Sequence, residues 1–421
     1  MMKGLRESAF FGPVLTIMSG STLAQLLPLI TEPILVRLFS PLEFGILALF
    51  LAVATLFSAV ATGRYELAIV LPNTDKKAVN ILALAMTIAI FMSILSFLVV
   101  LIFGDQLSKM LNSPELRPFL NWVPLFVLVS GIFQSFNQWA TRKKYYKNIA
   151  FSKISQSSSN AAVSLSTGWA GMNALGLIWG QITGWFIGST PLIFRFFKKD
   201  RALIKQVSRL EMKTQAKIYS DFPKINSAHI LSDIGQQSLV NFIIARFFSA
   251  PILGFYSRMI RIVKVPAGFI GTAVGQVFYQ QASEKWQKDQ DIRELFVGQL
   301  KMMLFLGLPI FGILAIWGPE IFDFVLGKDW GIAGKFAQIL SPWLFLNFLI
   351  SPFTQIPLIV NRQRHFFLIS LIMNLVVVLS FVGGYLINEE IETSLIIIST
   401  AQSVFHLYLI SWFYKLSRKK S

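Results

Sequence analysis

The sequence RLFSPLEFG at residues 37–45 returns as RFFSAPILG at residues 246–254, with Arg, Phe, Ser and Gly in the same positions. The second copy begins near the middle of a chain of 421 residues. A weaker echo pairs RKK at residues 142–144 with RQR at residues 362–364. Membrane transporters are often built from such repeats, and copies separated by an even number of spans share one orientation in the membrane. The repeat therefore predicts two related halves.

Composition indicates what kind of fold the two halves adopt. Hydrophobic residues make up 54% of the chain and charged residues 14%. This is too apolar for a soluble protein, and the chain is long enough for about twelve spans of roughly 20 residues each. We expect an all-α polytopic membrane protein with two six-helix lobes, related by a parallel repeat, and a central cavity between the lobes. The expected boundaries are residues 1–197 for the N-terminal lobe, 198–217 for a basic cytoplasmic linker and 218–421 for the C-terminal lobe.

The net charge of +17 indicates how the chain is oriented in the membrane. Most of its 38 Lys and Arg residues fall on one side if both termini are cytoplasmic, with clusters at residues 142–144, 195–217 and 415–420. Loops rich in Lys and Arg stay in the cytoplasm, so this distribution predicts an N-in, C-in topology. We interpret the clusters as topology signals and contacts for anionic membrane lipids, and we expect no nucleic-acid partner.

Three cations stand within one predicted membrane helix, with no acid between them: Arg258, Arg261 and Lys264. Their spacing places them within about 120° of one helix face. Charge at bilayer depth costs roughly 2.5 kcal/mol or more per residue, so such side chains face a watery cavity or a partner. Guanidinium groups offer a planar fork that suits phosphate. We expect the three cations to bind a phosphate or diphosphate headgroup, unless Lys264 and Arg261 reach the cytoplasmic edge or pair with Asp233.

Other predicted spans carry polar stripes that are expected to line the same cavity. The members are Asn226, His229, Asp233 and Gln236 in the seventh span, Gln25, Glu32, Thr55 and Ser58 in the first two spans, and Asn347, Ser351 and Gln355 in the tenth. The alternative for each neutral residue is a hydrogen bond between helices, worth about 0.6 kcal/mol. His229 and Asp233, at i and i+4, are either a proton-coupling pair or include a buried histidine with satisfied hydrogen bonds. Arg64 and Glu66 fit a gate or an anchor at the cytoplasmic end of the second span.

The sequence lacks the signatures of several other functions. It contains no cysteine, and its three histidines fall in separate spans, so we expect no metal site. It has no glycine loop of the kind that binds ATP. A membrane glycan polymerase or ligase would need a large outer loop with catalytic residues, and none is predicted. We therefore expect no cofactor and no enzymatic activity.

The segments LVRLFSPLEFGILAL at residues 35–49 and GRYELAIVLP at residues 63–72 resemble the opening of the bacterial polysaccharide transporter family. These proteins are the O-antigen and capsule repeat-unit flippases of the multidrug/oligosaccharidyl-lipid/polysaccharide exporter superfamily. The resemblance implies a bacterial inner-membrane flippase that moves undecaprenyl-diphosphate-linked oligosaccharides by alternating access. The resemblance implies that Arg258 and Arg261 contact the lipid headgroup. It also implies the polysaccharide polymerase and chain-length machinery as partners. A cation-coupled multidrug exporter and a lipid II flippase stay open as alternatives.

Overall fold

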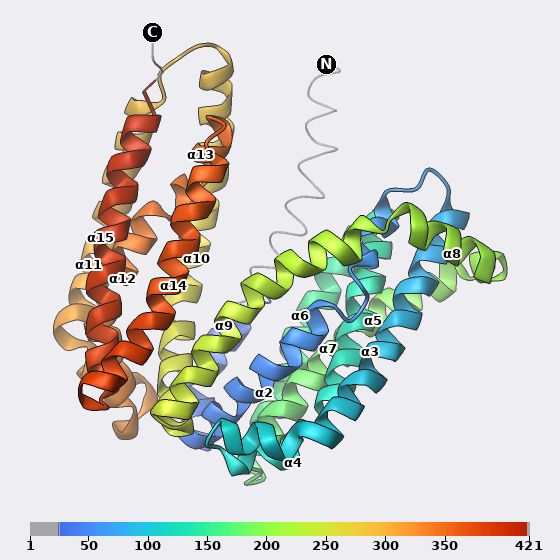
Figure 1. Cartoon of the computed structure of the whole chain (residues 1–421), viewed down its shortest axis with the longest axis horizontal. Helices are drawn as coiled ribbons and strands as arrows, with labels where there is room; N and C mark the ends of the chain where they lie inside the picture. Colours follow the sequence, from blue (N-terminus) through green and yellow to red (C-terminus); the bar gives the residue numbers. More distant parts are fainter. Residues whose placement is uncertain (1–23, 25, 419–421) are drawn as a thin grey trace. The chain divides into compact units, whose positions relative to one another are not determined.

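The computed structural model describes residues 24 and 26–418, and within these residues the chain forms helices joined by turns, without a strand. Contacts divide the chain after Arg246 into two compact units (Figure 1). We call the part up to Arg246 the first unit and the part from Phe247 the second unit. The expected basic linker at residues 198–217 falls inside the first unit.

The first unit opens with a helix over residues 26–38 and then runs through one chain of helices and short helical turns. These are α2 (Pro41–Ala59), η1 (Tyr65–Val70), α3 (Asp75–Met110), η2 (Pro114–Leu116), α4 (Arg117–Leu120), α5 (Val123–Arg142), α6 (Tyr146–Trp169), α7 (Ala174–Lys199), η3 (Arg201–Gln206), α8 (Arg209–Ile218), η4 (Phe222–Asn226) and α9 (Ser227–Phe247).

The second unit has fewer and longer helices. These are α10 (Ala250–Gln287), α11 (Arg293–Leu326), η5 (Lys328–Trp330), α12 (Gly331–Ile350), η6 (Ser351–Phe353), α13 (Ile356–Ile359), α14 (Gln363–Asn388) and α15 (Ile391–Leu416).

Several helices have the length and composition of membrane spans. Among the described residues, seven helices are long and apolar enough to cross a membrane, or eight if the bent pair Pro114–Leu120 and Val123–Arg142 is one span. Helix α3 illustrates their environment, because its most apolar stretch has a mean hydropathy of 2.8 and is only 17% buried. A soluble protein does not expose so large an apolar surface to water. The chain is therefore a multi-pass membrane protein, with these faces turned to lipid.

The repeated motif marks the same structural junction in both halves of the chain. The helix over residues 26–38 ends just before Ser40, whose Oγ accepts a hydrogen bond from the Glu43 amide at the start of α2. The Glu43 carboxylate accepts in return from the Ser40 amide, 2.6 Å away, which completes a capping box. At the second copy, α9 ends and Ser249 Oγ accepts from the Ile252 amide at the start of α10. The conserved spacing of serine in the two copies thus reflects a shared need to begin a helix directly after another.

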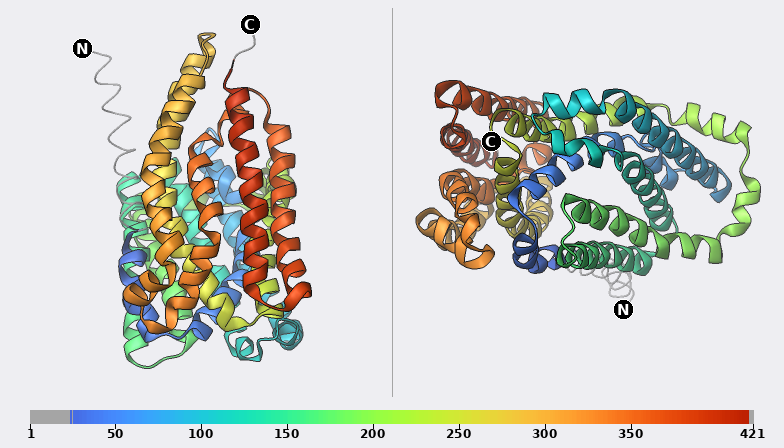
Figure 2. Two further views of the ribbon diagram at one scale, coloured as in Figure 1. Left: turned by 90° about the vertical axis from the view of Figure 1, so that its left-hand side faces the viewer. Right: turned by 90° about the horizontal axis from the view of Figure 1, so that it is seen from below.

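The two units also repeat one pattern of neighbouring helices. In the first unit α3 packs on α5 and α6 on α7, while α5 also contacts α2 and α7. In the second unit α11 packs on α12 and α14 on α15, while α12 also contacts α10 and α15. Helices α14 and α15, orange and red, run side by side in Figures 1 and 2. The agreement supports the internal repeat predicted from the sequence.

The basic segment after α7 is docked on the first unit by a buried asparagine. Asn80, on α3, is fully buried. Its Nδ2 donates to the Gln206 carbonyl at 3.0 Å, and its Oδ1 accepts from the Ser208 amide at 2.9 Å. The Tyr65 hydroxyl donates to the Ala216 carbonyl at 3.0 Å and holds the next helix, α8. The segment is therefore part of the folded first unit.

Replacing Asn80 with Ala should loosen this segment. The Gln206 carbonyl and the Ser208 amide lose their partner, and an unsatisfied buried group costs about 1–3 kcal/mol. We expect trypsin to cut the membrane-embedded variant faster within residues 201–217, without a change in helix content by circular dichroism. Asn388→Ala is the control, because the hydrogen bonds that its side chain makes to described residues lie within an exposed turn. Equal cleavage of the Asn80 variant and the wild type would contradict this docking.

Candidate functional site on helix α10

The three predicted cations lie on the first half of α10 and differ in exposure. Arg258 is buried, with 5% of its surface exposed, Arg261 is half-buried and Lys264 is exposed. From Ala250 the helix contains no acidic residue before Glu284. Both arginines make contacts within the protein. The sequence thus brings a local excess of positive charge into a helix that is long and apolar enough to span a membrane, and the structure leaves Lys264 exposed.

Lys264 belongs to a polar cluster formed by α10, α12 and α15. Its Nζ lies 4.7 Å from the ring centroid of Trp343, in the geometry of a cation–π contact. One turn further along α12, Asn347 Nδ2 lies 3.2 Å from His406 Nε2. His406 Nδ1 lies 2.7 Å from the Gln402 carbonyl oxygen, which can only accept. Nδ1 therefore carries the proton, and Nε2 accepts from Asn347.

Trp343 and His406 were not among the residues predicted from the sequence. His406 is 1% exposed and Trp343 is 8% exposed, so both are buried in the second unit. A histidine in an otherwise apolar span is a signal that could have identified His406, because ionisable residues are rare there. Trp343 carried no such signal, because its role depends on which face of α12 meets Lys264.

A pocket of about 530 Å³ lies between α10 and the turn η6. It is lined by Gly268, Gly271, Thr272, Gly275, Gln276, Tyr279, Ser351, Pro352, Thr354 and Gln355. The lining is neutral throughout and has hydroxyl or amide groups on six side chains. Its volume falls in the usual range of small-molecule sites. Ser351 and Gln355 of the predicted tenth-span stripe are among its walls.

Close packing of α10 on η6 depends on glycine. A Cβ built on Gly271 would lie 2.2 Å from Ser351 Oγ, and one built on Gly275 would lie 3.3 Å from the Pro352 backbone. At Gly268, in contrast, a Cβ would meet no atom within 4 Å. The first two glycines allow contact between the elements, whereas the third leaves space in the pocket open.

The predicted residues of the first two spans divide into contacts within helices and contacts between them. Thr55 Oγ1 donates to the Leu51 carbonyl of its own helix at 2.6 Å. Ser58 Oγ is hydrogen-bonded to Ser130 Oγ on α5, so it joins two helices. Glu32 is buried, with 1% exposed, and has interactions within the protein. Gln25 lies outside the described residues. For Ser58 the structure therefore favours the alternative of a hydrogen bond between helices.

The predicted stripe of the seventh span lies on η4 and α9. Asn226 and Gln236 are half-buried there. His229 Nδ1 lies 3.3 Å from Asp233 Oδ2, and their side chains are 72% and 63% exposed. The pair is therefore formed as expected from its spacing, but His229 is not a buried histidine.

The motif GRYE at residues 63–66 forms a tight turn between α2 and α3. Gly63 and Arg64 both have left-handed backbone conformations, with φ of 59° and 60°. The turn places Arg64 Nη1 3.2 Å from Glu66 Oε1, and the Thr62 hydroxyl donates to the same carboxylate. Burial raises the pKa of the Glu66 carboxyl above its ordinary value, while the hydrogen bond from Thr62 and the charge of Arg64 act in the opposite direction. This local pairing suits an anchor for the turn.

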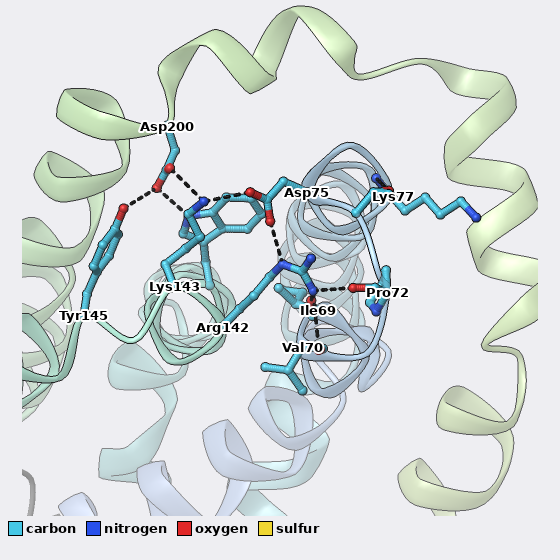
Figure 3. Close-up of polar contacts among 11 residues, drawn as sticks. Ile69, Val70, Pro72, Asp75, Lys77, Arg142, Lys143, Tyr145 and Asp200 are labelled. Carbon is cyan, nitrogen blue, oxygen red and sulfur yellow. Dashed lines mark hydrogen bonds and ion pairs between the residues drawn. The ribbon is translucent and has the colours of Figure 1, made fainter. Parts of the chain in front are cut away.

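Two residues of the basic cluster at residues 142–144, Arg142 and Lys143, are held by two carboxylates (Figure 3). Arg142 Nε lies 3.0 Å and Lys143 Nζ 2.7 Å from Asp75, and Lys143 also lies 3.4 Å from Asp200. Burial lowers the pKa of Lys143, but the hydrogen bond and charge of Asp75 and the charge of Asp200 outweigh it, so its pKa lies above the ordinary value. Asp200 also accepts hydrogen bonds from the Tyr145 hydroxyl and the Trp139 indole. The network ties α3, α5 and α7 together, which is a structural task.

The exposures of Arg258 and Lys264 predict effects of different size on stability. Arg258→Gln should lower the free energy of unfolding by at least about 2 kcal/mol, because the side chain is buried and takes part in an interaction within the protein that glutamine would not reproduce. Lys264→Gln should change it by no more than about 1 kcal/mol, because the side chain is exposed and loses only its cation–π contact with Trp343. Thermal unfolding of the purified protein in detergent measures both. Equal losses would show that the burial of the two residues is not as described.

Comparison with known proteins places the chain in a family. Residues 34–335 match the model of a family described as polysaccharide biosynthesis protein. The succinoglycan biosynthesis transport protein ExoT of Rhizobium meliloti is 22% identical over 319 residues, which cover 75% of this chain and 62% of that protein. The chain therefore spans less than two thirds of the length of this relative.

Solved structures share the fold at low sequence identity. An inward-facing multidrug resistance MATE family transporter of the MOP superfamily aligns with a TM-score of 0.66 at 13% identity, over 97% of this chain and 99% of that chain. The lipid II flippase MurJ, in an inward closed conformation, aligns with a TM-score of 0.65 at 13% identity, over 96% and 90%. These likenesses confirm the all-α polytopic fold class. Because the family model covers well over half of the sequence, the chain belongs to the polysaccharide biosynthesis protein family, as its opening motifs indicated.

Proposed function

We propose that the protein is a flippase that moves undecaprenyl-diphosphate-linked oligosaccharide, whose diphosphate is anionic, across the bacterial inner membrane by alternating access. The observation that carries the proposal is the stripe of Arg258, Arg261 and Lys264 on α10, with no acid before Glu284. Excess positive charge in a membrane span favours an anionic guest, and partial exclusion of water strengthens the attraction. Membership in a polysaccharide biosynthesis family supports a glycan as the cargo.

The three cations would have different tasks in binding a diphosphate. Arg261 is half-buried and Lys264 exposed, so their side chains can meet the ligand directly. Arginine offers two parallel donors to phosphate, whereas lysine acts as a point charge. The Trp343 ring lies against Lys264 and limits where its ammonium can go. Arg258 is buried, so it would add to the positive potential at the ligand without contacting it directly.

The rival functions differ in the chemistry that they need. A cation-coupled multidrug exporter needs acidic groups to hold cationic drugs, and α10 offers the opposite charge. A lipid II flippase carries the same diphosphate chemistry, and it is supported here by similarity of fold alone. The family match favours a repeat unit of O-antigen, lipopolysaccharide or capsule over lipid II. The polysaccharide polymerase and chain-length machinery would then receive the product.

Removing the two accessible cations should slow translocation. In vesicles that contain a fluorescent lipid-linked oligosaccharide, the Arg261→Gln, Lys264→Gln double variant should lower the initial rate of flipping at least about tenfold. Each lost hydrogen bond to a charged group is worth about 1.5–3 kcal/mol, and 1.4 kcal/mol corresponds to a factor of ten. Lys288→Gln, at the exposed end of the same helix, is the matched control. An unchanged rate in the double variant would overturn the assigned role of the α10 cations.

The proposed N-in, C-in topology can be tested without altering native thiols, because the chain has no cysteine. We expect a cysteine placed at Lys144 to react with a membrane-impermeant maleimide only after the cell envelope is opened to the cytoplasm. A cysteine placed at Glu389 should react from the periplasm in intact spheroplasts. The reverse pattern would show the opposite orientation.

A further inference from the structure

We propose that the neutral pocket between α10 and η6 is a carbohydrate subsite that binds the sugar next to the lipid diphosphate. The inference rests on the proposed function. It assigns the sugar of the substrate to the part of α10 between Gly268 and Tyr279. Four observations support it. The pocket lies on the same face of α10 as the cations, and it is a short distance from them. Its lining side chains have free hydrogen-bonding groups, and there is open space at Gly268.

The pocket continues the face of α10 that carries the cations. At 100° per residue, Arg261, Lys264 and the α10 residues of the pocket fall within an arc of about 140°. Lys264 and Gly268 are about one turn apart and lie within about 40° of each other around the helix. A ligand held at Lys264 therefore meets the pocket without crossing to another face.

The separation matches the length of the substrate. Lys264 and Thr272 are eight residues apart, or about 12 Å along the helix axis. A diphosphate with one attached sugar ring is of comparable length, so one ligand can contact both Lys264 and the pocket. With a volume of about 530 Å³ the pocket has room for one or two sugar rings.

The walls offer the hydrogen bonds that sugar hydroxyls need. The hydroxyls of Thr272, Ser351 and Thr354 donate to backbone carbonyls of their own turns, at 2.7, 2.9 and 3.1 Å. Their oxygens keep lone pairs that can accept from a sugar O–H. Within the described part of the chain, the amides of Gln276 and Gln355 form no hydrogen bond to protein, so both can donate and accept. Acceptors and donors thus stand together without a charged group, which favours an uncharged sugar.

Gly268 gives the means to close the pocket without disturbing its walls. Since a Cβ at this position meets no atom within 4 Å, a larger side chain would extend into open space. Gly312, on α11, is open in the same way and lies outside the pocket lining. Gly268→Leu therefore tests the pocket, and Gly312→Leu controls for adding the same side chain to a membrane helix.

Binding of two probes to the full chain in lipid nanodiscs separates the subsite from the headgroup site. One probe is a polyprenyl diphosphate, and the other is the same lipid diphosphate carrying N-acetylglucosamine. We expect wild type to bind the sugar-bearing probe about tenfold more tightly. Gly268→Leu should remove this preference and leave the affinity for the bare diphosphate unchanged, as in Gly312→Leu. Gln276→Leu, which adds little bulk, should weaken the preference several-fold and guards against misfolding of the glycine variant.

The outcomes for the two proposals differ. Equal binding of the two probes by wild type, or a loss of bare-diphosphate affinity in Gly268→Leu that equals the loss for the sugar-bearing probe, would overturn the subsite. If the sugar preference were absent while Arg261→Gln still weakened both probes, the headgroup site and the proposed function would stand. If Arg261→Gln weakened neither probe, the proposed function would fail independently of the pocket.

Discussion

The cost of placing positive charge in a membrane-spanning helix is the constraint on which the second unit depends. Arg258, Arg261 and Lys264 are stable at that depth only if protein groups, water or an anion surround them. The structure meets part of this need with contacts to both arginines and with the Trp343 ring against Lys264. The exposure of the cations rises along the helix, from buried Arg258 to exposed Lys264. An anionic substrate would supply the remaining negative charge that these cations need at this depth.

The internal repeat makes the asymmetry of charge informative. Each unit begins a helix directly after its copy of the repeated serine, Ser40 or Ser249, and the two units pack their corresponding helices in the same pattern. Yet the positions of α2 that align with Arg258 and Arg261 are Leu49 and Ala52, which are buried apolar residues. The first unit instead joins its helices through Ser58 and Ser130 and holds its basic segment through Asn80. The two halves share an architecture, while the cationic stripe belongs to the second alone.

The sequence predicted the class of fold and the cations within a membrane span, because hydrophobic periodicity and charge in a span are local signals. It did not predict Trp343, His406 or the pocket against η6. Those depend on which faces of α10, α12 and α15 meet, and on Gly271 and Gly275 letting η6 approach. His229 shows the same limit, since its spacing to Asp233 predicted the pair but not its exposure. Polar residues in spans were recognisable from sequence, whereas their division between cavity and helix contacts required tertiary structure.

The central claim is that the second unit binds the diphosphate of a lipid-linked glycan along one face of α10. A structure of the protein bound to a sugar-bearing polyprenyl diphosphate tests this most directly. We expect both phosphorus atoms within about 5 Å of the Arg261 guanidinium or the Lys264 ammonium, as direct charge-assisted hydrogen bonds require. We also expect the first sugar between Gly268 and Gln355. Diphosphate density away from α10, with these side chains unchanged, would contradict it.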